Sequence, residues 1–207
     1  MKDIKNIFTS KRLLVMLFVF LFWLGCYLLF NFITSLRETY NPGFAFETSI
    51  PFIPEFVFIY LMVFLVIFVP FFFVRKMDFY FAMAKSYIFV IIVSCIIYLL
   101  YPAELPRYEY AMDTFSGWAL NLLYAFDMPH NLLPSMHVSM AFLSSFIVNS
   151  YSKKYGIFLI ALSVLISIST LFIKQHYILD VVTGFILALI GYCVFVYLKK
   201  NKFLFPK

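Results

Sequence analysis

Charged residues are scarce in this chain of 207 residues: only 13% are Asp, Glu, Lys or Arg, whereas 64% are hydrophobic. Soluble domains typically carry about 25% charged residues, and the 29 Phe and 15 Tyr here are too many to bury in one small core. The composition therefore excludes a typical water-soluble protein, and low charge with abundant aromatics also excludes a disordered chain. We expect the chain to reside in a lipid bilayer.

Glycine and cysteine are also sparse. The six Gly and nine Pro follow no period, which excludes a collagen-like or low-complexity chain. Cys26, Cys95 and Cys193 lack metal-ligand spacing and lie inside apolar runs, where cysteine usually acts as a small buried hydrophobe. The net charge is +6, but no basic stripe with stacking aromatics accompanies it, so nucleic acid is not expected as a partner.

Six apolar runs are long enough to cross about 30 Å of hydrocarbon as helices. None alternates with period two, and backbone groups in lipid must be satisfied within a helix or a closed barrel, so helices are predicted. Pro70 should kink the second helix. The expected fold is an all-α integral membrane six-helix bundle in one domain, residues 1–207. The uncharged parts of the runs are 13–36, 56–74, 86–103, 132–152, 155–173 and 181–198.

The first run follows four basic residues and so resembles a signal peptide. It is too long and lacks a small-residue cleavage site, so a retained helix is predicted. Gly25-Cys26 faintly resembles a lipoprotein cleavage site, but Trp23 lies just upstream and no soluble domain follows. We therefore expect no cleavage there.

Assigning the connections alternately to two sides places 13 of the 16 basic residues on one side and eight of the ten acids on the other. By the positive-inside tendency the basic side is cytoplasmic. Both termini are therefore predicted to be cytoplasmic, in a multi-pass protein of the plasma membrane. The 13 basic residues are Lys2, Lys5, Lys11, Arg12, Arg75, Lys76, Lys85, Lys153, Lys154, Lys199, Lys200, Lys202 and Lys207.

The outer side holds only three cations, Arg37, Arg107 and Lys174. Arg37 is expected to anchor the end of the first helix, and the acids Glu47 and Glu55 are expected only to decorate the outer face.

The long outer connection, residues 104–131, contains apolar residues at helical spacing behind Asp113-Thr114, a plausible N-cap. This pattern predicts a short amphipathic helix lying in the membrane interface. A loop helix packed on the bundle is an equal alternative.

His137 closes the segment Pro-Ser-Met-His at 134–137, at the outer start of the fourth run. Pro134 suits the first turn of a helix because its missing N–H is not needed there. Ser135 and His137 are then expected beside unpaired N–H groups and the positive end of the helix dipole, which together favour an anion.

His176 precedes Asp180 by four residues at the outer start of the sixth run. At this spacing the two share a helical face, so the carboxylate can accept from one ring nitrogen and leave the other as a base or nucleophile. Arg107 and Lys174 complete a plausible phosphoryl-transfer set. No divalent-metal site or other cofactor is expected, because Asp180 has no carboxylate near it in the sequence.

These residues resemble the motifs of the type 2 phosphatidic acid phosphatase superfamily, K-x6-R-P, P-S-x-H and S-R-x5-H-x3-D. The segment 134–137 matches the second motif completely, and Ser169, His176 and Asp180 match the third at the correct spacing. Thr170 stands in the place of the third motif's arginine. Arg107 can represent the first motif, but Leu100 replaces its lysine and Tyr108 its proline.

The resemblance covers roughly residues 50–195, and the His-Tyr-x-x-Asp string is similar to the branch that contains inositol phosphorylceramide and sphingomyelin synthases. It implies that His176 is the nucleophile, oriented by Asp180, and that His137 is the general acid. Ser135, Arg107 and Lys174 are the expected phosphate-binding residues, although a lysine snorkelling at a helix end is the alternative for Lys174.

Three functions remain open at this point. The leading prediction is metal-independent hydrolysis of a membrane lipid phosphate at the outer face through a phosphohistidine. The second is transfer of a phosphorylated head group to a lipid alcohol at the same site. The third is a non-catalytic transporter that uses the histidines and Asp180 as a proton relay. The oligomeric state is not predicted.

Overall fold

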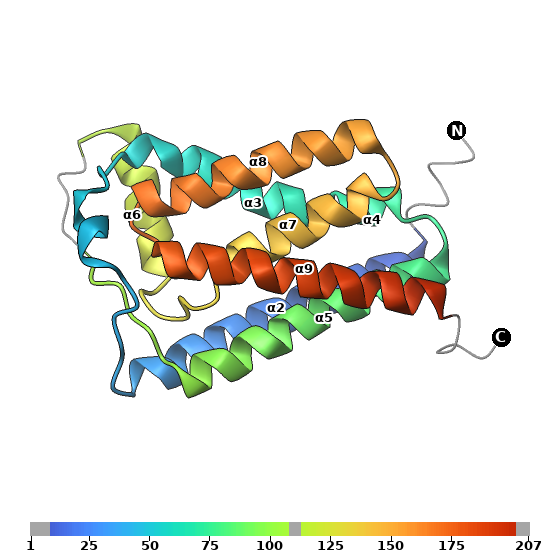
Figure 1. Ribbon diagram of the computed structural model, residues 1–207, viewed down its shortest axis with the longest axis horizontal. Coiled ribbons are helices and arrows are strands. Elements are labelled where there is room, and N and C mark those ends of the chain that lie inside the picture. Colours follow the sequence, from blue (N-terminus) through green and yellow to red (C-terminus); the bar gives the residue numbers. More distant parts are fainter. Residues whose placement is uncertain (1–8, 108–112, 202–207) are drawn as a thin grey trace.

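The computed structural model describes residues 9–107 and 113–201 (Figure 1). Among these, the only β pairing is an isolated bridge between Tyr40 and Ala103, and helices make up the rest of the regular structure, so the all-α prediction is confirmed. Lys2, Lys5, Tyr108, Lys202 and Lys207, which entered the sequence predictions, lie outside the described residues.

Long helices run side by side along the longest axis of the molecule (Figure 1). Five helical segments are long and apolar enough to cross a membrane, and the protein is therefore membrane-embedded. The α-helices are α2 (Ser10–Ser35), α3 (Val57–Phe68), α4 (Pro70–Phe73), α5 (Met77–Leu100), α6 (Phe115–Phe126), α7 (Met136–Asn149), α8 (Lys153–Phe172) and α9 (Ile178–Lys200), and η1 (Ala45–Ser49) and η2 (Pro54–Phe56) are 3-10 helices. The five segments are α2, Pro54–Phe73, α5, α8 and α9.

The fourth predicted run forms a shorter helix than expected. Helix α7 has 14 residues, about 21 Å at 1.5 Å per residue, which is less than the hydrocarbon thickness. The chain before it, residues 127–135, is irregular, and it is mostly buried from Asn131 onward. Asn131 takes a left-handed φ of 57° while its side-chain amide donates to the Tyr27 carbonyl. Non-helical backbone is tolerated at membrane depth where protein surrounds it. The apolar Leu132 and Leu133 made the run look longer than the helix is.

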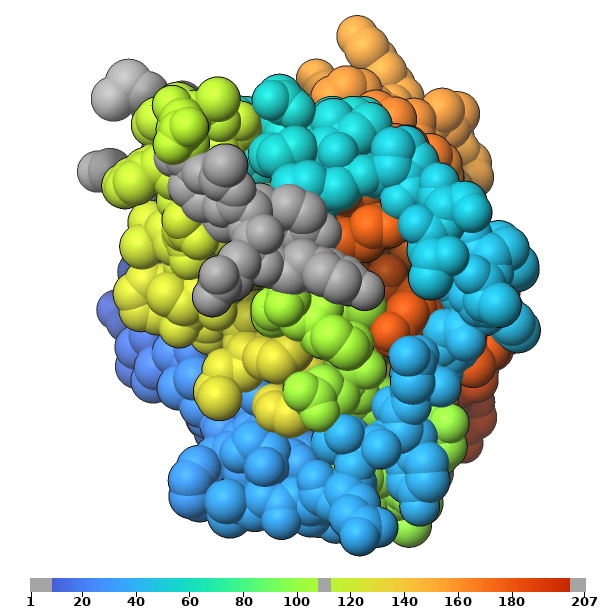
Figure 2. Space-filling model, turned by 90° about the vertical axis from the view of Figure 1, so that its left-hand side faces the viewer, coloured from blue at the N-terminus to red at the C-terminus, as the bar shows by residue number. Residues whose placement is uncertain are grey.

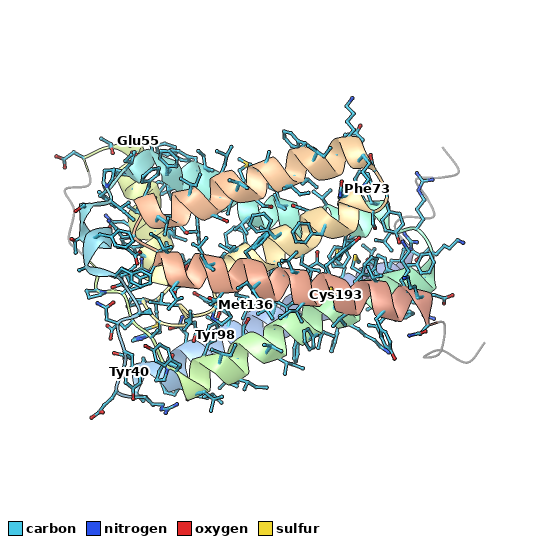
Figure 3. All side chains as sticks on the ribbon, in the orientation of Figure 1. Tyr40, Glu55, Phe73, Tyr98, Met136 and Cys193 are labelled. Atoms are coloured by element: carbon cyan, nitrogen blue, oxygen red, sulfur yellow. The ribbon has the colours of Figure 1, made fainter. Side chains whose placement is uncertain are left out.

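Helix α7 is the central element of the bundle. It packs against α8, α9, α3 and α5, and nearly all its side chains are buried. Met136 is the first residue of α7. Figure 3 shows that it lies further along the bundle than Tyr40 and Glu55, which belong to the connecting segments at one end, and that it lies close to Tyr98 of α5. The Tyr98 hydroxyl donates to the Pro134 carbonyl at 3.0 Å, which ties the start of α7 to α5.

A kink at Pro70 and the start of α5 were also predicted from the sequence. Pro70 interrupts the second span between α3 and α4, but Val69 keeps helical torsion angles, so the helix is broken locally and continues as predicted. Helix α5 begins at Met77, nine residues before the predicted run, because that run excluded the charged residues of the first turns. Asp78 lies in the first turn, where a carboxylate is favourable.

The first residue of α2 and the last of α9 lie at the same end of the bundle (Figure 1). The opposite end carries residues 36–56, residues 101–107, α6 and the turn between α8 and α9, and we name it the loop end. Arg37 anchors α2 there by donating to the Leu99 carbonyl of α5, as predicted.

Helix α6 confirms the predicted helix within residues 104–131. The Thr114 side chain caps it by accepting from the Gly117 N–H. Its two faces differ: Ala119, Leu120 and Leu123 are buried against the start of α3, whereas the opposite face exposes large apolar side chains. The exposed set is Phe115, Trp118, Leu122 and Phe126.

Candidate active site

The turn between α8 and α9 places His176 at the loop end. Helix α8 ends at Phe172, and Lys174 then adopts a left-handed φ of 50°, which turns the chain back toward the bundle. The N–H groups of Gln175 and His176 both donate to the Thr170 carbonyl, at 2.8 and 3.3 Å. His176 therefore precedes α9 by two residues, rather than lying on the helix as expected, and its backbone is fixed by hydrogen bonds.

Asp180 holds the side chain of His176. One carboxylate oxygen accepts from the Tyr177 N–H at 2.8 Å, which caps the start of α9, and the same oxygen lies 3.3 Å from Nδ1 of His176. Asp180 is completely buried, and within the described part of the chain its other oxygen has no hydrogen-bond partner. The contact to Nδ1 leaves Nε2 of His176 as the ring nitrogen available for chemistry.

The start of α7 brings His137 to the same place. Ser135 is the N-cap, and its hydroxyl accepts from the Val138 N–H at 3.3 Å, so the helix begins at Met136, and Pro134 precedes the cap instead of occupying the first turn. The Ser135 N–H donates to the Asp180 carbonyl at 3.0 Å. This bond joins α7 to α9 directly.

Gly184 permits this close approach of the two helices. A Cβ atom on Gly184 would lie 2.6 Å from the Ser135 carbonyl oxygen, which is too close for a real contact. Glycine is therefore required where α9 passes the start of α7.

The two histidine rings lie close together, with their planes inclined at 57°. Their centroids are 6.0 Å apart, and both side chains are more than nine-tenths buried. A phosphorus atom between a nucleophilic nitrogen and a proton-donating nitrogen needs a separation of this order. The structure thus brings together His137, His176 and Asp180, which the sequence had grouped only by pattern.

Aromatic side chains enclose His137 on its other sides. Tyr60 lies 5.1 Å from the His137 ring centroid, and Tyr27 and Phe64 meet it edge-on at 6.2 Å. The Tyr60 hydroxyl is 3.0 Å from Nε2 and 3.2 Å from Nδ1 of His137 and also donates to Asp127 at 2.9 Å. No sequence pattern points to these residues, since Tyr60 is one of 15 tyrosines, and Asp127 is one of eight outer acids and belongs to no motif.

Arg107 lies against the His176 turn. Its guanidinium donates to the Lys174 carbonyl at 3.3 Å, to the Gln175 side-chain oxygen at 2.9 Å and to the Asp127 carbonyl at 2.8 Å. It also lies over the Tyr124 ring at 4.0 Å. Burial lowers the pKa of Arg107, and its buried Nε has no hydrogen-bond partner among the residues that the structure describes.

Lys174 lines the site but its ammonium is already engaged. Nζ donates to the Ile50 carbonyl at 2.6 Å and approaches the Glu47 carbonyl at 3.5 Å. Burial lowers the pKa of Lys174, while the charge of Glu47 acts in the opposite direction. The side chain therefore ties the α8–α9 turn to residues 41–52, which we name the strap.

The expectation that Glu47 merely decorates the surface is wrong. Glu47 is 6% exposed, and its carboxylate accepts from the N–H groups of Phe44 and Ile178, at 2.9 and 2.8 Å. It thus binds the strap to the positive N-terminus of α9. Glu55, by contrast, is exposed and accepts only from Ser116, at 3.3 Å, among the contacts described.

A cavity of about 760 Å³ opens between the strap and the His176 turn. Figure 2 shows the atoms of this turn at the floor of a hollow, partly covered by the strap. Lys174, His176 and Tyr177 line it from the turn, Leu105 and Pro106 from the neighbouring loop, and strap residues including Asn41, Thr48 and Ser49 from the other side. His176 lines the cavity and His137 does not.

A metal centre has no obvious place in the described part of the chain. Within residues 9–107 and 113–201, no group of three or more His, Cys, Asp or Glu side chains could hold a metal ion. The groups available for phosphate chemistry are therefore the paired histidines, their carboxyl partners and Arg107.

Comparison with known proteins agrees with the motifs. A family model described as the PAP2 superfamily matches residues 28–194, a range that includes every site residue predicted from the sequence. Neither the curated proteins nor the solved structures contain a match.

Proposed function

Since this chain belongs to the PAP2 superfamily, we propose that it is a membrane lipid phosphate phosphatase that works through a phosphohistidine on His176. The observation that carries the proposal is the facing pair of buried histidines, 6.0 Å apart, one of them held by Asp180. Membership of the family supports phosphatase-type chemistry on lipid phosphates. The individual roles below are our inference from the geometry.

In the first half-reaction, the Nε2 lone pair of His176 attacks phosphorus, and the bond from phosphorus to the lipid oxygen breaks. Protonated His137 gives its proton to that oxygen, and the lipid alcohol leaves. A water oxygen then attacks phosphorus, its proton passes to His137, and the phosphorus–nitrogen bond breaks. The second step releases inorganic phosphate and restores both histidines, with no metal in either step.

Arg107 is our first choice for binding a phosphate oxygen, because its unpartnered Nε lies beside the His176 turn. Ser135 and Lys174 remain weaker predictions, since the Ser135 hydroxyl caps α7 and the Lys174 ammonium binds the strap. Lys174 is better explained as a residue that positions the strap.

We further propose a six-segment arrangement in the plasma membrane, with α7 as the fourth segment, both termini cytoplasmic and the loop end outside. The basic excess at the opposite end supports this orientation. The exposed apolar face of α6 supports its placement in the membrane interface, where aromatic side chains are favoured.

The size of the cavity favours a second candidate, transfer of a phosphorylated head group to a lipid alcohol. A volume of about 760 Å³ beside His176 has room for a head group larger than a phosphate. Head-group transfer would use the same first half-reaction, and an alcohol would replace water in the second. A transporter is disfavoured, because the ionisable groups gather near one end of the bundle, whereas transporter sites lie near the midplane.

The test is a metal-free assay of purified protein in detergent with a chelator, using a panel of lipid phosphates and measuring both free phosphate and transferred head group. Wild type should turn over at least one lipid, His176→Ala should lose turnover and His137→Ala should lose roughly 10²- to 10⁴-fold. His130→Ala is the matched control, with activity within about twofold of wild type. Equal and negligible turnover by wild type and His176→Ala would contradict the proposal.

A further inference from the structure

Asp127 is a buried carboxyl group on which several elements converge. It follows α6 directly and is 8% exposed. One carboxylate oxygen accepts from the Tyr27 hydroxyl of α2, and the other accepts from the Tyr60 hydroxyl of α3 at 2.9 Å. Its main-chain carbonyl accepts from Arg107 at 2.8 Å. A buried carboxyl group costs free energy unless it is neutral or hydrogen-bonded. The burial of Asp127 among these partners therefore indicates a specific role.

The Tyr60 hydroxyl connects this carboxyl group to His137. The hydroxyl is fully buried and lies within 3.2 Å of both His137 ring nitrogens while it contacts Asp127. Asp127, Tyr60 and His137 therefore form one continuous hydrogen-bonded chain. Asp180 contacts His176 directly, whereas Asp127 reaches His137 only through the Tyr60 hydroxyl.

We propose that Asp127 is a positioning residue for the reaction, acting on His137 through the hydroxyl of Tyr60. This inference rests on the proposed function, in which His137 protonates the departing lipid oxygen.

The polarity of the chain explains what Asp127 does. When the Tyr60 hydroxyl donates to ionised Asp127, its oxygen is left to accept an N–H of His137, which orients the His137 ring toward Tyr60. An isolated imidazolium in this apolar surrounding would be costly, and a carboxylate one hydroxyl away offsets part of that cost. The arrangement therefore orients the His137 ring and lowers the cost of the charge that the ring carries when it transfers a proton to the lipid oxygen.

Other titratable groups face this chain from the neighbouring elements. Tyr27 contacts Asp127 from α2, Arg107 binds its backbone, Tyr124 lies under Arg107, and His176 faces His137. Burial raises the pKa of Asp127 to about 7. Near neutral pH the carboxyl group is thus able to take up or release a proton, as a partner of a proton-transferring histidine should.

The kinetic test compares two phosphate esters with different leaving groups, octyl phosphate and an octyl-bearing nitrophenyl phosphate. The alkoxide of octyl phosphate needs a proton in order to leave, whereas a nitrophenolate does not. A variant in which His137 is poorly positioned should therefore hydrolyse octyl phosphate more slowly and the nitrophenyl ester almost normally. In Asp127→Asn and Tyr60→Phe, we expect hydrolysis of octyl phosphate to fall roughly 10- to 100-fold and that of the nitrophenyl ester by less than about threefold. Equal losses on both esters, or no loss on either, would overturn the proposal.

The matched control is Tyr87→Phe, which removes a buried tyrosine hydroxyl that binds Ser144 at 2.6 Å elsewhere in the bundle. It should leave the ratio of the two rates unchanged. If either test variant fails to fold, as judged by size-exclusion chromatography, the other carries the same prediction.

A spectroscopic measurement tests the chain without relying on activity. The protein has three histidines, so ¹⁵N-histidine spectra of His130→Ala and His176→Ala variants identify the His137 ring nitrogens. Asp127→Asn removes the negative charge behind Tyr60, and Tyr60→Phe removes the hydroxyl that contacts both ring nitrogens, so the His137 nitrogen resonances should shift in both variants. Unchanged His137 resonances in Asp127→Asn and Tyr60→Phe would overturn the inference even if no substrate had been found. Altered resonances in a protein that hydrolyses neither ester would refute the proposed function while retaining the hydrogen-bonded chain.

Discussion

The candidate site contains two buried histidines that differ in how they are supported. His176 is bound directly by Asp180, which also caps α9, whereas His137 reaches Asp127 through Tyr60. The first arrangement follows from a four-residue spacing and is readable in the sequence. The second joins residues 67 and 77 positions apart, and no local pattern could have indicated it.

Stability should depend on pH through Asp127. Burial raises its pKa from 3.8 to about 7, so the folded state binds the proton more tightly than the unfolded state. This contribution is fully present below about pH 4 and is lost as pH rises through about 7, with an upper limit of about 4 kcal/mol. The apparent melting temperature in detergent should therefore fall between about pH 5 and pH 8.

The comparison variant is Asp127→Asn, which cannot ionise. Its melting temperature should decline less over the same interval. Parallel curves for the variant and wild type would show that Asp127 does not titrate there.

At the scale of elements, the short helix α7 and the irregular chain before it decide where His137 lies. The start of α7 lies inside the bundle, where it contacts Tyr60 of α3, Tyr98 of α5 and Asp180 of α9. The apolar run in the sequence covered both the helix and its buried approach, so composition predicted a full span. Only the packing of residues 127–135 against the other helices shows where the irregular chain ends and the helix begins.

The approach of α9 to α7 is testable at Gly184. In Gly184→Ala, the new methyl group must displace the Ser135 backbone, since it would lie 2.6 Å from its carbonyl oxygen. We expect a lower melting temperature and roughly tenfold lower activity, because Asp180 and His176 would move relative to His137. Gly25→Ala is the control.

No atom lies within 4 Å of a Cβ atom built on Gly25 in α2. The same substitution there should be neutral or stabilising by up to about 1 kcal/mol, since alanine favours helices. Equal effects at the two glycines would contradict the close approach of α9 to α7.

The whole molecule is polarised along its long axis. The loop end carries the strap, the cavity and the histidine pair, and the opposite end carries most of the basic residues described. Large apolar side chains on α2, α8 and α9 are exposed along the sides, as expected for helices that face lipid tails. With the proposed orientation, a lipid phosphate in the outer leaflet would meet the cavity at the level of its head group.

Orientation can be measured by cysteine labelling of intact cells. In a background without Cys26, Cys95 and Cys193, Thr48→Cys in the exposed part of the strap should react with an impermeant maleimide. Lys153→Cys, which is exposed at the opposite end, should react only after the membrane is permeabilised. The reverse pattern would place the active site in the cytoplasm.

The sequence by itself determined the membrane environment, the helical class, the approximate spans and the motif histidines, because apolar runs, charge distribution and short spacings are local properties. It predicted Thr114 as a cap and Asp180 as the partner of His176 for the same reason. The tertiary structure alone decided the depth of α7, the burial of Glu47 between the strap and α9, and the convergence of Tyr27, Tyr60 and Asp127 on His137. These features depend on contacts between residues far apart in the chain, and packing of the bundle fixes them.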